Sequence, residues 1–252
     1  MKGFSLAVCV LFSTIQAFSQ VMIGGEEDAK PAKKEKILAE KDTVKSLVAD
    51  GSSAVYFVAN WSHTDRVLTV NDGFFGDSLG KRADETSLNL WSYGIGIQNR
   101  INKNLMWDGG ISLTRNGESY RDAGADSTFA YQTYYSYIGM PLRINYTIGK
   151  DVMFYVGTGV MPQIFWLFKQ EQKWSNGQGD SGNESIKTKS GYNSFVFSGL
   201  FNLGVKLNFS NGWSLLVSPE ARIQLNSSYT SQDSYVHKAR AYGITFGLTR
   251  NL

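Results

Sequence analysis

The chain has 252 residues, of which 42% are hydrophobic and 19% charged, with 26 glycines, one cysteine and a formal net charge of +3. This composition excludes a disordered chain and a disulfide scaffold, and the nearly balanced charge argues against a nucleic-acid-binding protein. The longest apolar run, Phe4 to Phe18, is shorter than the roughly 20 residues that a membrane-spanning helix needs. The many aromatic residues and glycines favour β structure.

The first 19 residues form a secretion signal. Lys2 supplies a cationic start, an apolar core follows, and Ala17-Phe18-Ser19 has the small-x-small pattern that signal peptidases cleave. Gln20 is therefore the expected new N-terminus, and the protein leaves the cytoplasm. Cys9 is removed with the signal, so thiol chemistry and disulfides play no part in the mature chain.

Residues 20–51 form a charged periplasmic leader. Between Gly24 and Asp50, lysines are mixed with acidic residues and no aromatic residue occurs. A weak helical stripe through Ile37, Val44 and Val48 leaves two interpretations open. The segment is either a short amphipathic helix or a solvated tether.

From residue 52 to residue 252 the hydrophobicity alternates with period two, as β-strands require. The pattern is sharpest near the C-terminus, where Trp213, Leu215 and Val217 alternate with Ser214 and Ser218. Eight such segments predict an all-β fold, an eight-stranded antiparallel up-and-down transmembrane β-barrel. The segments are 55–61, 91–97, 105–114, 138–144, 154–166, 195–209, 213–225 and 242–248.

The two faces of these strands indicate which side meets lipid. If the large apolar residues pointed inward from eight strands they would overfill the lumen, and the outside would carry only glycine, serine and asparagine. In the opposite orientation the apolar residues face lipid and the small polar residues line a narrow interior, as in outer-membrane barrels. The sequence therefore predicts an outer-membrane protein with outer-membrane lipid and lipopolysaccharide around it.

The connections predict the orientation across the membrane. Outer-membrane barrels have long extracellular loops and short periplasmic turns. The long connections follow the odd-numbered segments and the tight, turn-forming ones follow the even-numbered segments, so both termini are expected in the periplasm. The long connections are 62–86, 116–127, 169–190 and 227–237, and the short ones are 101–104, 148–151 and 210–212.

Two sets of side chains are singled out on the barrel. Five tryptophans near strand ends on the lipid face suit the headgroup layer: Trp61, Trp91, Trp107, Trp166 and Trp213. Five charged residues are expected to point into the lumen: Asp108, Arg143, Lys206, Glu220 and Arg222. Buried charges persist mainly when paired, so we expect these to form a network that fills the lumen, with a narrow ion path as the alternative.

A family resemblance is carried by the fourth and fifth segments. Tyr137-Ile138-Gly139-Met140-Pro141-Leu142-Arg143-Ile144-Asn145-Tyr146 is followed by Gly149-Lys150 and then by Phe154-Tyr155-Val156-Gly157-Thr158-Gly159. This stretch resembles the hairpin of the Bacteroidetes outer-membrane β-barrel family called PorT-like. Gly139 departs from the acidic residue usual in that family, and the chain ends in Leu252 instead of phenylalanine. The resemblance implies fold and location, and the family is functionally heterogeneous.

Three functions follow as expectations. The first is a non-enzymatic structural, adhesive or complex-forming role, and the second, implied by the resemblance, is an accessory part of type IX protein secretion with envelope or secretion-complex partners. The third is an outer-membrane lipid A-modifying enzyme, because His63 and His237 are expected on one extracellular rim, near Ser62, Asp65, Asp233 and Ser234. No spacing motif joins a base to a nucleophile, so we expect no enzyme activity. Without a phosphate-binding loop or metal-ligand cluster, no cofactor is expected either.

Overall fold

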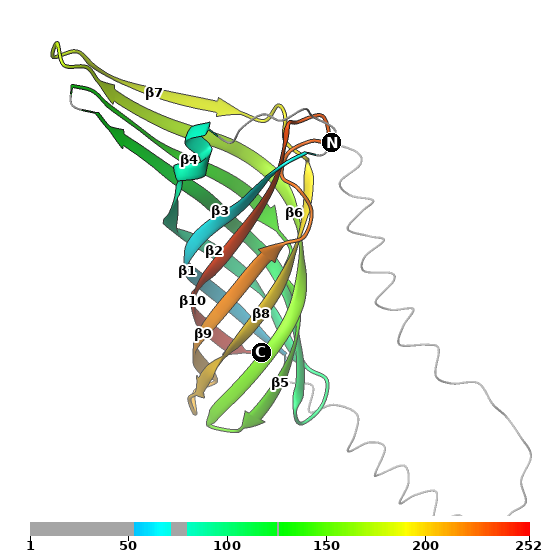
Figure 1. Ribbon diagram of the computed structural model, residues 1–252. Coiled ribbons are helices and arrows are strands. Elements are labelled where there is room, and N and C mark those ends of the chain that lie inside the picture. Colours follow the sequence, from blue (N-terminus) through cyan, green and yellow to red (C-terminus); the bar gives the residue numbers. More distant parts are fainter. Residues whose placement is uncertain (1–52, 72–79, 125) are drawn as a thin grey trace, which may run out of the picture. The chain divides into compact units, whose positions relative to one another are not determined.

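The computed structural model describes residues 53–71, 80–124 and 126–252 (Figure 1). The signal peptide predicted at 1–19 and the leader predicted at 20–51 lie outside the described residues. Within the described ranges, no helix is long and apolar enough to cross a membrane.

The described residues form ten β-strands and one short 3-10 helix. Their order and bounds are β1 Ser53–Val70, η1 Gly80–Asp84, β2 Thr86–Arg100, β3 Leu105–Ala123, β4 Thr128–Gly139, β5 Leu142–Gly149, β6 Val152–Ser175, β7 Ser181–Thr188, β8 Phe195–Asn208, β9 Trp213–Gln224 and β10 Tyr235–Asn251.

The strands close into an antiparallel barrel, as the sequence predicts. β1 pairs with β2 on one side and with β10 on the other, the latter continuously from Ala54 opposite Asn251 to Val70 opposite Tyr235. Each remaining wall strand pairs with its neighbours, so the ring has no open edge. Closure satisfies the backbone groups that lipid cannot hydrogen-bond.

The described residues contain ten strands instead of the predicted eight, for two reasons. β4 and β5 share one place in the wall, since both pair with β3 and β6, and Pro141, which has no N–H to donate, lies in the gap between them. β7 pairs with β6 alone, beyond the ring. The ring itself therefore has eight positions.

The alternation of the sequence places apolar side chains outside and polar side chains inside. Ile95 and Ile111, paired across β2 and β3, are each 62% exposed, whereas the neighbouring Ser112 is buried. The other outward residues of the wall strands continue this surface, which we call the apolar belt. A surface of large exposed hydrophobic side chains around a polar interior is the architecture of a transmembrane β-barrel.

Three short turns lie at one end of the barrel. Gly149 ends β5 with a φ of 106°, and Gly212 precedes β9 with a φ of 80°, a conformation that side chains other than glycine rarely adopt. At Gly149 a Cβ atom would also lie 2.1 Å from the carbonyl oxygen of Val152. The backbone conformation of glycine therefore allows the tight turns at Gly149 and Gly212 that connect adjacent strands at this end.

At the opposite end, two of the expected long loops prove to be paired strands. β3 and β4 stay paired up to Ala123 and Thr128, and β6 continues to Ser175, where β7 turns back along it. The outer parts of the four strands form a sheet that we call the extension, comprising residues 115–123, 128–136, 167–175 and 181–188. Figure 1 shows it leaving the barrel obliquely. Prediction of loops at 116–127 and 169–190 was wrong because cross-strand pairing outweighs the loop-forming tendency of their Asn, Gly, Ser and Gln residues.

Candidate functional site

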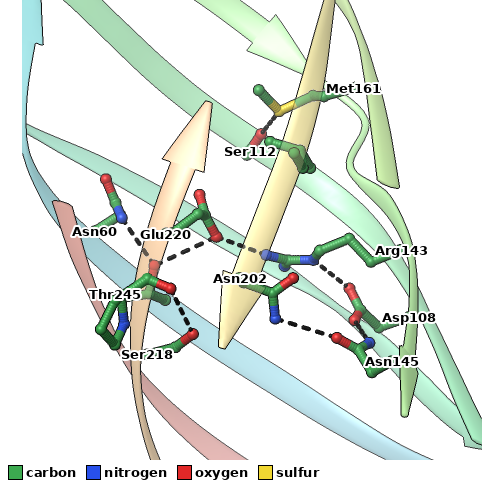
Figure 2. A network of polar contacts seen from close by, with 12 residues as sticks. Asn60, Asp108, Ser112, Arg143, Asn145, Met161, Asn202, Ser218, Glu220 and Thr245 are labelled. Atoms are coloured by element: carbon green, nitrogen blue, oxygen red, sulfur yellow. Dashed lines mark hydrogen bonds and ion pairs between the residues drawn. The ribbon is translucent and has the colours of Figure 1, made fainter. Parts of the chain in front are cut away.

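The lumen of the barrel is crossed by an ion triad. Arg143 on β5 donates from Nε to Asp108 Oδ1 on β3 at 2.9 Å and from Nη1 to Glu220 Oε2 on β9 at 2.7 Å (Figure 2). All three side chains are nearly buried. Because β3 and β5 are adjacent while β9 lies across the lumen, the guanidinium joins opposite walls.

Neutral amides and hydroxyls complete the coordination of the two carboxylates. Asn145 Nδ2 donates to Asp108 Oδ2 at 2.7 Å, and Asn202 Nδ2 donates to Asn145 Oδ1 at 3.1 Å. Thr245 lies beside Glu220, with 3.4 Å between Thr245 Oγ1 and Glu220 Oε2. The lone pairs of the buried carboxylates are thus largely satisfied, which is the condition for retaining charge away from water.

The other two charges predicted to face the lumen do so, but they bind neutral partners. Lys206 on β8 donates from Nζ to Gln98 Oε1 at 2.9 Å. Arg222 on β9 donates from Nη2 to Asn116 Oδ1 at 2.8 Å. Neither makes an ion pair with any described residue. The expected mutual pairing of all five charges is therefore limited to the triad, because Lys206 and Arg222 find amide oxygens closer at hand.

Two small cavities adjoin the triad, and Tyr56, Arg143 and Glu220 line both. Their volumes are about 40 and 20 Å³. A single water needs roughly 10–15 Å³ measured in this way, so each cavity holds a few waters at most. Side chains therefore fill most of this part of the lumen.

An aromatic cluster, which the sequence analysis missed, fills the lumen towards the extension. Tyr135 and Tyr137 are almost completely buried there, with Phe165, Phe168 and Tyr229 packed against them. Tyr135 donates to Glu118 Oε1 at 2.9 Å, so the buried hydroxyl has a partner. Tyr229 lies in the connection between β9 and β10, and burial raises its pKa above the ordinary value for tyrosine, so its phenol stays neutral.

The sequence did carry a signal for this cluster. Tyr135 and Tyr137 have the same parity as the inward-facing Gly139, whereas Ile138 faces outward. The segment predicted at 138–144 began one residue after Tyr137 and three residues after Tyr135, so it included neither.

The two histidines do not meet, so their predicted juxtaposition on one rim was wrong. His63 faces outward from β1 and contacts Asn89 Oδ1 at 3.0 Å. His237 is fully buried, with its ring 4.7 Å from that of Tyr135 and 5.0 Å from that of Tyr229. They lie on opposite faces of the sheet because His63 pairs with Tyr242, five residues beyond His237. Within the described part of the chain, no group of three or more His, Cys, Asp or Glu residues is placed to hold a metal ion.

The tryptophans predicted at the membrane interfaces lie on the outer face. Trp61 and Trp91 are directly opposed across β1 and β2, and they are exposed, as are Trp166 and Trp213. Trp107 is partly covered, beside Ile144 on the neighbouring β5. Trp61, Trp91 and Trp166 lie towards the extension, and Trp107 and Trp213 lie towards the short turns.

Comparison with known proteins finds similar architectures at low identity. No protein-family model matches the chain, and no curated protein matches it in sequence. Among solved structures, Neisserial surface protein A is 15% identical with a TM-score of 0.40, covering 79% of this chain and 99% of its own. The Escherichia coli outer membrane protease OmpT is 9% identical with a TM-score of 0.44, covering 81% and 97%. OprG from Pseudomonas aeruginosa is 11% identical with a TM-score of 0.39, covering 80% and 96%.

Proposed function

We propose that this chain is an outer-membrane β-barrel protein without enzyme activity, acting as a structural, adhesive or complex-forming component with both termini in the periplasm. The observation that carries the proposal is the combination of an apolar belt with a lumen closed by the Arg143–Asp108–Glu220 triad. An apolar exterior suits lipid, and a filled interior suits a component whose contacts lie outside the barrel.

The closed lumen is tested by conductance. Wild-type protein reconstituted in a planar bilayer should show no steady ion current, whereas Arg143→Ala should admit current because it removes the side chain that bridges the lumen. Fractionation of cells should recover the chain with the outer membrane, and its mobility on gels should change on boiling. A conducting wild type would contradict the closed lumen, and soluble recovery without heat-modifiable mobility would contradict membrane insertion.

A second candidate is an accessory role in type IX secretion, as in the PorT-like family. The support is the resemblance of 137–159, which folds as the β4–β5–β6 unit with its turn at Gly149. Cross-linking in intact cells with identification of the captured proteins tests it. Capture of secretion components would favour this role, and their absence from the captured proteins would favour the structural or adhesive one.

The lipid A-modifying alternative draws no support from the histidines, which lie on opposite faces of the sheet. Mass spectra of lipid A from cells that express the wild-type chain or a His237→Phe variant should be identical. A modified lipid A that is present with the wild-type chain and absent with the His237→Phe variant would support enzyme activity.

A further inference from the structure

The outer face of the extension carries a concentration of cations. Alternation along the four strands brings five basic side chains to the face that continues the apolar belt, against one acidic side chain, Glu171. Only one of the five cations makes an ion pair with a described residue, that of Lys169 with Glu171. We call this surface the basic face; its cations are Arg115, Arg121, Lys169, Lys173 and Lys187.

The register sets four of these cations in two rows, and Arg115, opposite Ser136, lies nearer the barrel than both. In the row nearer the barrel, Lys169 on β6 lies directly opposite Lys187 on β7. In the outer row, Arg121 on β3 and Lys173 on β6 flank Ala130 on β4. Like charges directly opposite each other across a strand pair destabilise a sheet. An anion held over this face would remove that repulsion.

The row of side chains between these two rows holds Ser119, Gln132, Glu171 and Ser185. Its two ends are short hydroxyl side chains, and its middle carries the Gln132 amide and the Glu171 carboxylate, which pairs with Lys169. Phosphate-sized groups can therefore approach the long lysine and arginine side chains over Ser119 and Ser185. The site is a broad charged surface, not a cavity.

The basic face begins where the apolar belt ends. Arg115 follows the exposed Leu113 by two residues on β3, and Lys169 follows the outward-facing Trp166 by three residues on β6. At about 3.3 Å per residue, the first cations lie roughly 7–10 Å along the strands from the last lipid-facing side chains. That is the depth of the lipid headgroups beside the hydrocarbon, and the oblique departure of the extension carries it away from the barrel end (Figure 1).

We propose that the basic face binds the phosphate groups of lipopolysaccharide in the outer leaflet around the barrel. The proposal rests on the outer-membrane location proposed above and adds a ligand and a surface to it. Lipid phosphates are chosen over a distant soluble polyanion because the same strand faces that contact hydrocarbon continue directly into the cations. Each Lys or Arg near an anionic membrane surface contributes roughly fivefold to binding.

The test compares two variants that lose the same charge at opposite ends of the barrel. Lys173→Gln/Lys187→Gln removes two cations of the basic face that make no ion pair with a described residue. Lys103→Gln/Lys150→Gln removes two exposed lysines from the short turns. Each protein is refolded in detergent, and its heat-modifiable mobility is checked first. Binding of fluorescently labelled deep-rough lipopolysaccharide is then measured by anisotropy, along with binding of the same lipid after removal of its phosphates.

We expect the Lys173/Lys187 variant to bind lipopolysaccharide about 10- to 30-fold more weakly than wild type. The Lys103/Lys150 variant should match wild type, dephosphorylated lipid should bind all three proteins equally, and added salt should reduce the difference. Equal affinities of the two variants for the phosphorylated lipid would overturn the proposal. Labelled heparin serves as a second probe in the same assay. If the Lys173/Lys187 variant lost binding to heparin but not to lipopolysaccharide, the proposal would also be overturned, and the face would be assigned to a soluble glycan. Failure of all three proteins to form heat-modifiable barrels would instead contradict the proposed membrane insertion.

Discussion

Replacing Arg143 with methionine should destabilise the barrel more than any single neutralisation of its partners. The guanidinium donates to Asp108 at 2.9 Å and to Glu220 at 2.7 Å, and without it two nearly buried carboxylates face each other across the lumen. Removing one partner of a buried ion pair costs about 3–5 kcal/mol. Two hydrogen bonds to charged groups, at about 1.5–3 kcal/mol each, give a similar sum.

The assay is urea unfolding of barrels refolded in lipid vesicles, followed by tryptophan fluorescence. With a typical urea slope near 2 kcal/mol/M, a loss of about 4 kcal/mol lowers the midpoint by about 2 M. Glu220→Gln serves as the control, because the amide oxygen still accepts from Arg143 and the cost should be only about 1 kcal/mol.

A triple variant separates charge from packing. Asp108→Asn/Arg143→Met/Glu220→Gln removes the three charges together, and it should recover most of the stability lost in Arg143→Met, because a neutral interior has no unpaired carboxylates. If Arg143→Met is no less stable than Glu220→Gln, or if the triple variant is as unstable as Arg143→Met, the charge argument fails.

Three further outcomes are expected. Val217→Arg, at a site 48% exposed on the apolar belt, should cost about 2–4 kcal/mol in the same urea assay, and an unchanged midpoint would place that face outside lipid. Gly149→Ala must adopt a φ of 106° and should cost about 1–3 kcal/mol of unfolding free energy. Gly199→Ala is the control, because its added Cβ would meet no atom closer than 3.9 Å, and it should change the urea midpoint little. Equal effects of the two substitutions would contradict the strain argument. A protease-cleavable tag inserted at Gly177 should be cut on intact cells and one at Asn211 should not, and the reverse pattern would invert the orientation.

The outward-facing side chains of the barrel wall could be predicted because their orientation depends on local alternation alone. Each outward residue, such as Ile95 or Val217, is identified by its own parity and size. The extension escaped prediction for the opposite reason. Its strands are rich in residues that favour loops, and only the hydrogen-bonded partner strand, which the sequence does not identify there, holds Tyr120 opposite Tyr131 or Gln172 opposite Glu184.

The lumen could be predicted only in part. Parity alone predicts that Arg143 and Glu220 point inward, but their contact spans the barrel and depends on the stagger of all the strands between β5 and β9. The same dependence explains why Lys206 meets Gln98 and not a carboxylate. His237 was expected on the rim with His63 because the last strand was predicted to begin at Tyr242. β10 begins at Tyr235 instead, so His237 lies within the strand and its parity puts it inside.

β6 links the two ends of the protein in a single strand. Its 24 residues, at about 3.3 Å each, make it roughly 80 Å long, whereas the hydrocarbon of a bilayer is about 30 Å thick. Ser175 lies nine residue steps beyond Trp166, so the far end of β6 lies about 30 Å along the strand beyond the last interfacial ring. No hinge interrupts the pairing of β6 with β4 and β7 over that distance, apart from one bulge beside Tyr137. The tip is therefore a continuation of the barrel wall, held by backbone pairing along its whole length and not by a loop.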